Sequence, residues 1–257
     1  MSSEAPGFKD LFSKQSTDYA KFRPLYPAEL YDYLAGLVAE RKLAWDCGTG
    51  NGQAAVELAS RFERVLATDP SQKQIQSAEP RANIVYSVAS AESSGLPSAS
   101  AGQGVDLVTV AQALHWFKHD EFSREVKRVV RPGGVLAVWS YGLMEISPEV
   151  DFQVLHFYRD LLGPYWEPER RLVEEGYKSV RIPFEELKTP AFSMKADWTF
   201  EHLIGYLRTW SALQTCIVKT GEDPLEKMAL RLKAAWGRET HRPVIWPLSV
   251  RVFRIGS

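Results

Sequence analysis

Three glycines alternate with other residues where a strand pattern meets a helix pattern, and this junction constrains the fold of the 257-residue chain most strongly. The segment reads Asp46-Cys47-Gly48-Thr49-Gly50-Asn51-Gly52. Glycines at such a turn permit positive φ angles and let a ligand approach the bare backbone. The start of the following helix offers N–H groups that have no partner within the helix. The junction therefore predicts a nucleotide-cofactor site at a strand-to-helix turn.

The spacing of these glycines separates two classes of nucleotide. A dinucleotide fingerprint reads GxGxxG and places a pyrophosphate at the helix start. Here the third glycine comes one residue early, which gives GxGxG, and the acidic Asp46 precedes the first glycine. A carboxylate is unfavourable beside a pyrophosphate and favourable beside an ammonium group, directly or through water. The pattern favours a nucleoside that carries an amino acid, with an NAD(P)-dependent oxidoreductase as the alternative.

Short apolar runs and helical patterns alternate between residues 41 and 142, which is typical of a parallel sheet built from βαβ units. The expected strands are Leu43–Asp46, Arg64–Thr68, Asn83–Ser87, Asp106–Ala111 and Val135–Ser140. The expected helices are Gln53–Arg61, Ser71–Ala78 with Ser71 as its N-cap, and Glu121–Val130, which Arg131–Gly134 ends. Right-handed crossovers bring the carboxyl ends of such strands to one edge, where ligands bind.

Two further zones flank this core at 41–142. Residues 1–40 form an N-terminal segment with a Pro/Tyr-rich stretch from Tyr19 to Pro27 and an amphipathic helix pattern over Ala28–Glu40. Residues 143–257 are mostly helical in pattern, with strand-like runs at Ala191–Trp198 and Val244–Ile255. We expect the second run to close the sheet, and the helices to form a cap in the same domain.

Composition disfavours several function classes. Hydrophobic residues make up 45% of the chain and charged residues 25%, which is ordinary for a globular protein. A formal net charge of −1 gives no long-range attraction to nucleic acid or to an anionic membrane. Cys47 and Cys216 lack metal-ligand spacing and favour free thiols, and the first ten residues lack a secretory pattern. We expect a cytoplasmic protein with no metal site and no nucleic-acid or membrane partner; the oligomeric state has no sequence signal.

Two segments resemble one known family. Asp46 to Gly52 resembles the first motif of class I S-adenosylmethionine-dependent methyltransferases. Residues Ala111 to Phe117, AQALHWF, are similar to the His-Trp-Phe motif of the small-molecule group that includes methyltransferase type 11 and trans-aconitate methyltransferase-like enzymes. The resemblance implies a Rossmann-like α/β fold: a seven-stranded, mostly parallel sheet with helices on both faces, an antiparallel last strand and a helical cap. It also implies S-adenosyl-L-methionine as the cofactor.

The resemblance also implies residues for the cofactor. Asp46 would face its amine and Asp69, at the end of the second strand, its ribose, although Asp69 could instead cap a helix. Arg23 would pair with the methionine carboxylate and Tyr19 would close the pocket, unless they are a solvated arginine and a packing tyrosine. Where the family often has Asp, this chain has Ser90. The full implied set is Tyr19, Arg23, Asp46, Gly48, Gly50, Gly52, Asp69, Pro70, Ser90, Ala91 and Gln112.

The residues expected to contact the methyl acceptor are aromatic or basic. His115 is the candidate catalytic residue, because it could orient or neutralise a carboxylate or act as a base for a hydroxyl; a core histidine is the alternative. Trp116 could cover the cofactor or pack in the core. A helical pattern over Gly205–Ser211 carries three candidates for acceptor recognition: Arg208, Trp210 and Ser211.

These observations predict a methyltransferase that acts on a small-molecule acceptor. A carboxylate is ionised at neutral pH and needs no base, whereas a phenol or amine would need His115. The sequence shows no second convincing base, which favours a small carboxylic acid. A protein that binds the cofactor without catalysis is a further alternative. DNA amino-methylation is disfavoured, because Ala111–Leu114 lacks an (N/D)PPY tetrapeptide.

Overall fold

The computed structural model describes residues 22–102 and 104–256, and within them eight strands form one sheet. The strands are β1 Leu43–Cys47, β2 Arg64–Asp69, β3 Ile84–Val88, β4 Val105–Ala111, β5 Val130–Tyr141, β6 Glu185–Leu187, β7 Phe192–Trp198 and β8 Arg242–Arg254. Their order is β3-β2-β1-β4-β5-β8-β6, and β7 also pairs with β8. β1 to β5 are mutually parallel, whereas β8 is antiparallel to β5, β6 and β7.

The order reverses at the centre of the sheet. After β1 the chain crosses to β2 and β3 on one side, and then returns to β4 and β5 on the other. Asp46 on β1 lies in register with Thr109 on β4 at this point. Ligands of open α/β sheets bind beside the carboxyl ends of the strands at such a reversal. The topology therefore predicts a site above Cys47 and Ala111.

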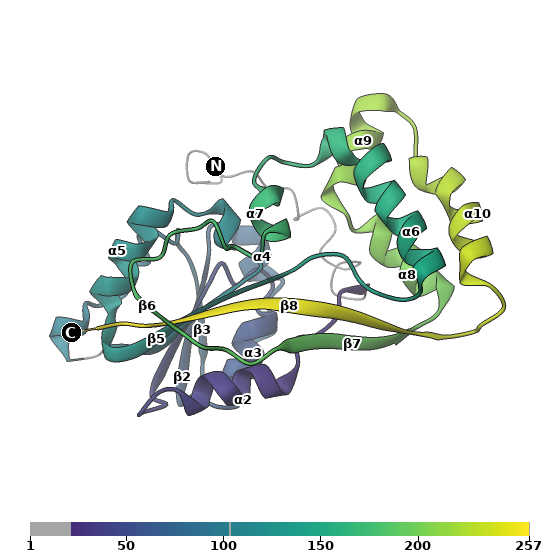
Figure 1. Cartoon of the computed structure of the whole chain (residues 1–257). Helices are drawn as coiled ribbons and strands as arrows, with labels where there is room; N and C mark the ends of the chain where they lie inside the picture. Colours follow the sequence, from purple (N-terminus) through teal and green to yellow (C-terminus); the bar gives the residue numbers. More distant parts are fainter. Residues whose placement is uncertain (1–21, 103, 257) are drawn as a thin grey trace.

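Helices cover both faces of the sheet and form a separate cap (Figure 1). The α-helices are α2 Ala28–Gly36, α3 Gln53–Ala59, α4 Gln72–Gln76, α5 His119–Val129, α6 Pro148–His156, α7 Arg170–Glu174, α8 Phe200–Arg208, α9 Ser211–Thr220 and α10 Pro224–Trp236. Short helical turns are η1 Ala99–Ala101, η2 Leu114–Trp116, η3 Phe157–Leu161 and η4 Gly163–Tyr165. One core lies between α2, α3 and the sheet, and a second lies between α5 and the opposite face.

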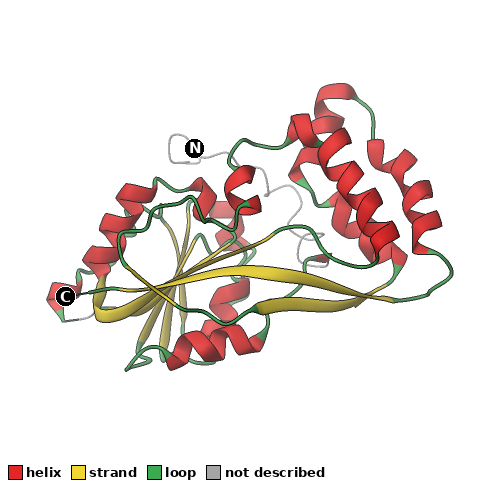
Figure 2. Ribbon diagram, in the orientation of Figure 1, coloured by secondary structure: helices red, strands yellow, loops and turns green. Residues whose placement is uncertain are grey.

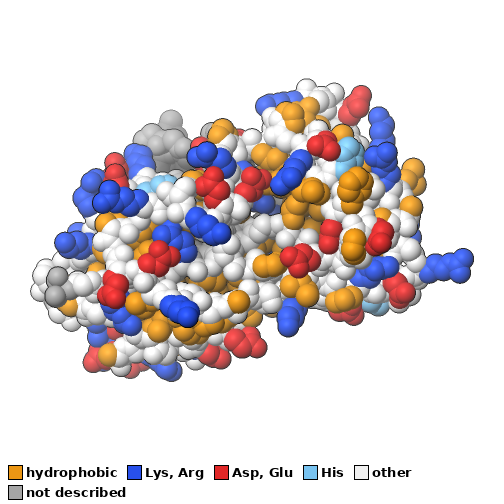
Figure 3. All heavy atoms as spheres, in the orientation of Figure 1, with side chains coloured by type: hydrophobic (Ala, Val, Ile, Leu, Met, Phe, Trp, Pro, Cys, Tyr) orange, Lys and Arg blue, Asp and Glu red, His pale blue; other side chains and the backbone are white. Residues whose placement is uncertain are grey.

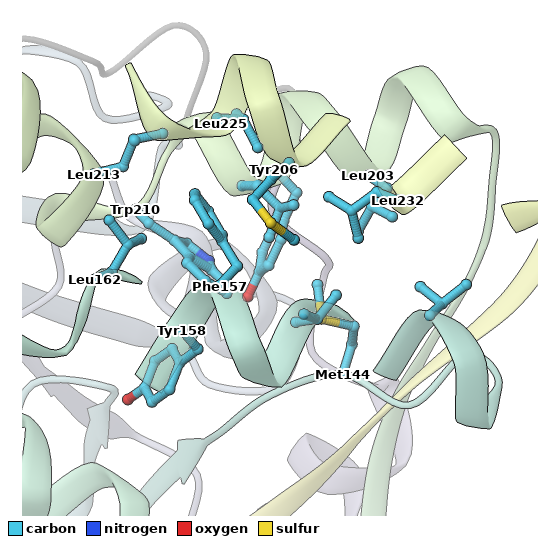
Figure 4. Close-up of a cluster of buried hydrophobic side chains, with 14 of the residues drawn as sticks. Met144, Phe157, Tyr158, Leu162, Leu203, Tyr206, Trp210, Leu213, Leu225 and Leu232 are labelled. Atoms are coloured by element: carbon cyan, nitrogen blue, oxygen red, sulfur yellow. The ribbon is translucent and has the colours of Figure 1, made fainter. Parts of the chain in front are cut away.

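The cap has its own hydrophobic core. Figure 2 shows α6, α8, α9 and α10 grouped beside the sheet, joined to it by the long β7–β8 pair. Figure 4 shows aromatic and aliphatic side chains of the cap meeting, among them Phe157 of η3, Tyr206 of α8 and Trp210 between α8 and α9. The Phe157 and Trp210 rings stack with centroids 5.9 Å apart. The cap is therefore a packed unit beside the sheet edge.

The sequence prediction of the fold class is confirmed, with three differences in detail. The sheet has eight described strands rather than seven, because the 13-residue β8 is long enough to pair with both β6 and β7 along one edge. α5 ends at Val129, one residue before the expected end, and Val130–Gly134 belong to β5, since a register shift beside Val105 accommodates the extra residues. The expected helix over Gly205–Ser211 is interrupted: α8 ends at Arg208 and α9 begins at Ser211.

Candidate cofactor and acceptor site

A cavity of about 570 Å³ lies between the carboxyl edge of the sheet and the cap. Its wall combines the turn after β1, the ends of β2, β4 and β5, the turn η2, and residues of the cap. Predicted site residues in this wall are Arg23, Gly48, Gly50, Asp69, Gln112, His115, Trp116, Trp210 and Ser211. The structure thus brings together residues that lie almost 190 positions apart in the chain.

The glycine turn forms the floor of the cavity. Gly48 has φ +69°, and a Cβ there would lie 2.7 Å from the Cβ of Ala113, so the turn after β1 packs closely against the segment after β4. Gly50 has φ +57°, and nothing lies closer than 4.0 Å to its Cβ position. Because Gly50 lines the cavity, its bare backbone is open to a ligand.

Asp69 links the end of β2 to this turn. Its Oδ2 accepts a hydrogen bond from Gly50 N at 2.9 Å, and its Oδ1 accepts one from Ser71 N at 2.9 Å. Ser71 caps α4, as the sequence predicted. Each carboxylate oxygen can accept more than one hydrogen bond. Asp69 therefore fixes the turn and also presents an acceptor group to the cavity that it lines.

Asp46 lies beneath the cavity rather than in its wall. The carboxylate is fully buried and accepts hydrogen bonds from Thr49 Oγ1 at 2.6 Å and from Thr109 Oγ1 at 2.7 Å. Burial raises the pKa of Asp46 to about 6, against the lowering effect of the two hydroxyls. Asp46 therefore ties the β1 turn to β4, and its expected role opposite a ligand amine, directly or through water, stays a prediction.

His115 occupies the wall at η2 with its Nδ1 3.0 Å from the hydroxyl of Tyr177. Burial, followed by the positive charges of Arg170 and His119, lowers the pKa of His115 to about 3. The imidazole is therefore neutral at physiological pH. A cationic His115 that neutralises a carboxylate, one role considered from the sequence, does not fit this environment.

Gln112 turns the chain after β4. It has φ +55°, and its side-chain amide pairs with the backbone of Tyr141: Tyr141 N donates to Oε1 at 2.9 Å, and Nε2 donates to Tyr141 O at 3.1 Å. The hydroxyl of Tyr141 accepts a hydrogen bond from Arg23 Nη1 at 2.9 Å. Gln112 thus holds the end of β5, and through Tyr141 the position of Arg23 in the wall.

The cap supplies an aromatic wall that sequence reasoning found only in part. Trp210, predicted, lines the cavity with Trp166, and their ring centroids lie 5.7 Å apart. Arg170 lines it as well and lies 4.9 Å from the centroid of Trp166. Trp166 and Arg170 were missed because they lie outside every recognised motif. The available signal was the Trp- and Tyr-rich composition of the stretch that contains them.

Several predicted residues lie outside this wall. Arg208 lies away from the cavity: its Nη1 lies 2.8 Å from Asp223 Oδ2, and half of its side chain is exposed at the end of α8. Gly52 caps α3, where a Cβ would lie 2.5 Å from the hydroxyl of Tyr86. The cavity wall also does not include Pro70, Ser90 and Ala91. Tyr19 lies outside the described residues.

The surface charge, the helices and the two cysteines are ordinary for a globular protein. On the face in Figure 3, Lys and Arg side chains alternate with Asp and Glu over most elements, without a patch of one sign. No helix in the described part of the chain combines the length and apolar character that crossing a bilayer requires. Cys47 and Cys216 are free and buried.

Comparisons with known proteins agree on one family. Residues 45–138 match the methyltransferase domain family. A protein of Dictyostelium discoideum named as a methyltransferase is 39% identical over 233 residues, covering 89% of this chain and 87% of that protein. Methyltransferase cfoB of Aspergillus candidus is 29% identical over 68% of this chain and 63% of its own length. A solved structure from Anaeromyxobacter dehalogenans, described as a type II methyltransferase, has 44% identity and a TM-score of 0.84, covering 91% of this chain and 99% of that one.

Proposed function

The chain belongs to the class I S-adenosylmethionine-dependent methyltransferases, and from this premise we propose that it methylates a small-molecule carboxylic acid held in the cavity between sheet and cap. The observation that carries the proposal is the cavity itself, which joins the glycine turn and Asp69 on one side to an aromatic wall on the other. Its volume of about 570 Å³ suits a nucleoside together with a small acceptor, and a polymer substrate would need a more open groove.

The residues present fit S-adenosylmethionine as the cofactor. The open backbone at Gly50 gives close access to the cavity floor, and Asp69 offers carboxylate oxygens suited to ribose hydroxyls. Arg23 offers a planar fork suited to the methionine carboxylate. We assign cofactor binding to these three residues. When bound, S-adenosylmethionine supplies an activated methyl group on a sulfonium centre.

The part left to the protein is to hold the acceptor near that methyl group and to exclude water. Positioning of reacting groups lowers a barrier substantially without any proton transfer. His115, with its pKa near 3, is a weak base at neutral pH, and a carboxylate acceptor needs no base. The neutral imidazole would instead donate or accept one hydrogen bond that orients the acceptor. Trp116, Trp210 and Ser211 would shape the space around it.

A labelled-methyl screen tests this proposal. Purified protein is incubated with S-adenosylmethionine carrying a tritiated methyl group and with matched sets of small carboxylic acids, phenols and amines. We expect label to enter organic-soluble methyl esters that mild base hydrolyses. Label in phenols or amines alone would overturn the carboxylic acid, and label in none, with cofactor binding intact, would favour a cofactor-binding protein without catalysis. The protein is proposed to act in the cytoplasm.

A further inference from the structure

The side chain of Arg170, the first residue of α7, is held in a fixed position at the cavity wall. Its Nε donates a hydrogen bond to the hydroxyl of Tyr158 at 2.8 Å. Its guanidinium carbon lies 4.9 Å from the centroid of the Trp166 ring and 5.5 Å from that of Tyr158. One edge and one face of the guanidinium are thus held, which fixes the direction of the remaining donors.

Among the described residues, those remaining donors have no protein partner. Neither Nη1 nor Nη2 of Arg170 makes a hydrogen bond or an ion pair with any residue that the structure describes. The nearest carboxylate in its network, that of Glu174, is reached only through the hydroxyl of Tyr158, which donates to it at 2.6 Å. By contrast, Arg208 is paired with Asp223 and Arg251 with Glu186. A fixed guanidinium fork open to a cavity is the arrangement that binds a carboxylate in two-point contact.

The positive charge of Arg170 acts on several sides of the cavity. It lowers the pKa of His115 on η2 and opposes the rise in pKa of Tyr177 and of the buried Tyr206. His115 itself carries no charge near neutral pH, so it neither competes for an anion nor repels a cation. This part of the wall therefore favours a negative group.

Glu167 and Glu169 lie in the same wall and could favour a cationic acceptor, but their environments differ from that of Arg170. Glu167 is already engaged in an interaction of its own. Oε2 of Glu169 is shielded from water and has no hydrogen-bond partner in the part of the chain that the structure describes. Arg170 lines the cavity, its position is fixed by Tyr158 and Trp166, and its terminal donors have no partner among the described residues, which makes it the stronger determinant.

We propose that Arg170 binds a carboxylate of the acceptor, while the apolar body of the acceptor packs against Trp166 and Trp210. This inference rests on the proposed function, because it assigns an acceptor subsite within the same cavity. Arg170 would be the residue that selects an acceptor with a negative charge. It also replaces Arg208, which the sequence had suggested for acceptor recognition.

Three probes with one aromatic body and different charge test the assignment: phenylacetate, phenylacetamide and 2-phenylethylamine. Their binding is measured by calorimetry in the presence of saturating S-adenosylhomocysteine. We expect wild-type protein to bind phenylacetate about 10- to 100-fold more tightly than phenylacetamide, the range expected for charge-assisted hydrogen bonds. Arg170→Met should abolish that preference and Arg170→Lys should keep part of it. Arg208→Met, which removes a paired arginine outside the cavity, should keep it in full.

Other outcomes overturn the assignment. These are equal binding of phenylacetate and phenylacetamide, tighter binding of the amine, no phenylacetate binding at millimolar concentration, or an unchanged preference in Arg170→Met. Binding of S-adenosylhomocysteine to each variant shows whether the protein is folded. If the wild type does not bind S-adenosylhomocysteine, the proposed function fails; if it binds but shows no preference by charge, only the role of Arg170 fails.

Discussion

The hydroxyl of Tyr177 lies 3.0 Å from Nδ1 of His115, and the two rings are nearly parallel with an interplanar angle of 20°. Tyr177 is fully buried, and its backbone is held at φ +60° after α7. Burial raises the pKa of Tyr177, and the positive charge of Arg170 and the nearby backbone N–H groups of His115 and Leu114 partly offset this rise. We expect the Tyr177 hydroxyl to donate its proton to Nδ1, which would leave the imidazole proton on Nε2 as the group offered to an acceptor.

This arrangement predicts how His115 behaves in solution. The ¹⁵N shifts of the ring should report a neutral Nε2–H tautomer from pH 8 down to pH 5, because the pKa of His115 is lowered to about 3. Turnover of the acceptor found in the labelled-methyl screen should show no inflection near pH 6.5. A cationic ring at pH 6, or the proton on Nδ1, would contradict the assignment.

Removal of the imidazole should separate acceptor turnover from cofactor binding. His115→Ala should lower turnover, because the acceptor loses one orienting hydrogen bond, by about 10- to 100-fold. The dissociation constant of S-adenosylhomocysteine should change less than about threefold. Tyr177→Phe, which removes only the hydroxyl that holds Nδ1, should lower turnover less and abolish the tautomer preference. A large loss of cofactor affinity in His115→Ala would show that the residue supports the cofactor instead.

Asp46 should make the protein less stable as pH rises. Its pKa is raised from 3.8 to about 6 in the folded protein, so the folded state binds a proton more tightly than the unfolded chain between these values. The free energy of unfolding therefore falls as pH rises through this window, and the loss is complete above pH 6. Asp46→Asn removes this effect. Relative to wild type, the variant should gain about 2 kcal/mol between pH 4.5 and 7.5 in urea denaturation. A difference that does not vary with pH would contradict the burial of a charge at this position.

Glu125 should have the opposite effect to Asp46 and make the protein more stable as pH rises. Its carboxylate accepts hydrogen bonds from Arg128 and from the backbone of Ser94, which lower its pKa to about 2. The stabilisation is present above pH 4.5 and is lost as pH falls towards 2. Because Arg128 is partly exposed, we expect Glu125→Gln to cost about 1–3 kcal/mol at pH 7. Glu121→Gln on the same helix, paired weakly with Lys118, is the control and should change stability by less than about 0.5 kcal/mol.

Gly50 can be tested against a glycine with the same backbone strain elsewhere. Gly50 and Gly95 both have positive φ, and a Cβ at either would meet no close neighbour. Alanine at each should therefore cost about 1–2 kcal/mol of stability. Only Gly50→Ala should also weaken binding of S-adenosylhomocysteine, because its backbone lines the cavity. Equal binding by the two variants would remove Gly50 from the cofactor site.

The fold was predictable where apolar runs are short and separated by strong turn signals. The expected strands at Leu43–Asp46 and Asp106–Ala111 agree with β1 and β4 to within one residue, because both are buried on both faces. The start of β5 was not predictable, since Pro132 and its neighbouring glycines normally end a strand. Pairing of Val130 with Val105 and backbone hydrogen bonds of Gly133 and Gly134 with Ile255 keep the segment in the sheet.

The site was predictable along the sheet edge and only partly in the cap. Gly48, Asp69 and His115 follow strands, so topology alone brings them together. The position of Arg208 could not be read from the sequence, because helix periodicity gives a face but not what that face meets, and at the end of α8 its side chain pairs with Asp223. Arg170 is the first residue of the five-residue helix α7, whose position depends on packing against β5 and η2, which local sequence does not encode.

The most direct test of the account is calorimetric titration of the purified protein with S-adenosylhomocysteine, with NADH as a parallel ligand. We predict one binding site per chain with a dissociation constant of about 1–100 μM, no binding of NADH, and a loss of at least about tenfold in Asp69→Ala. No heat with S-adenosylhomocysteine at millimolar concentration, or preferential binding of NADH, would contradict a cofactor site at the turn between β1 and α3.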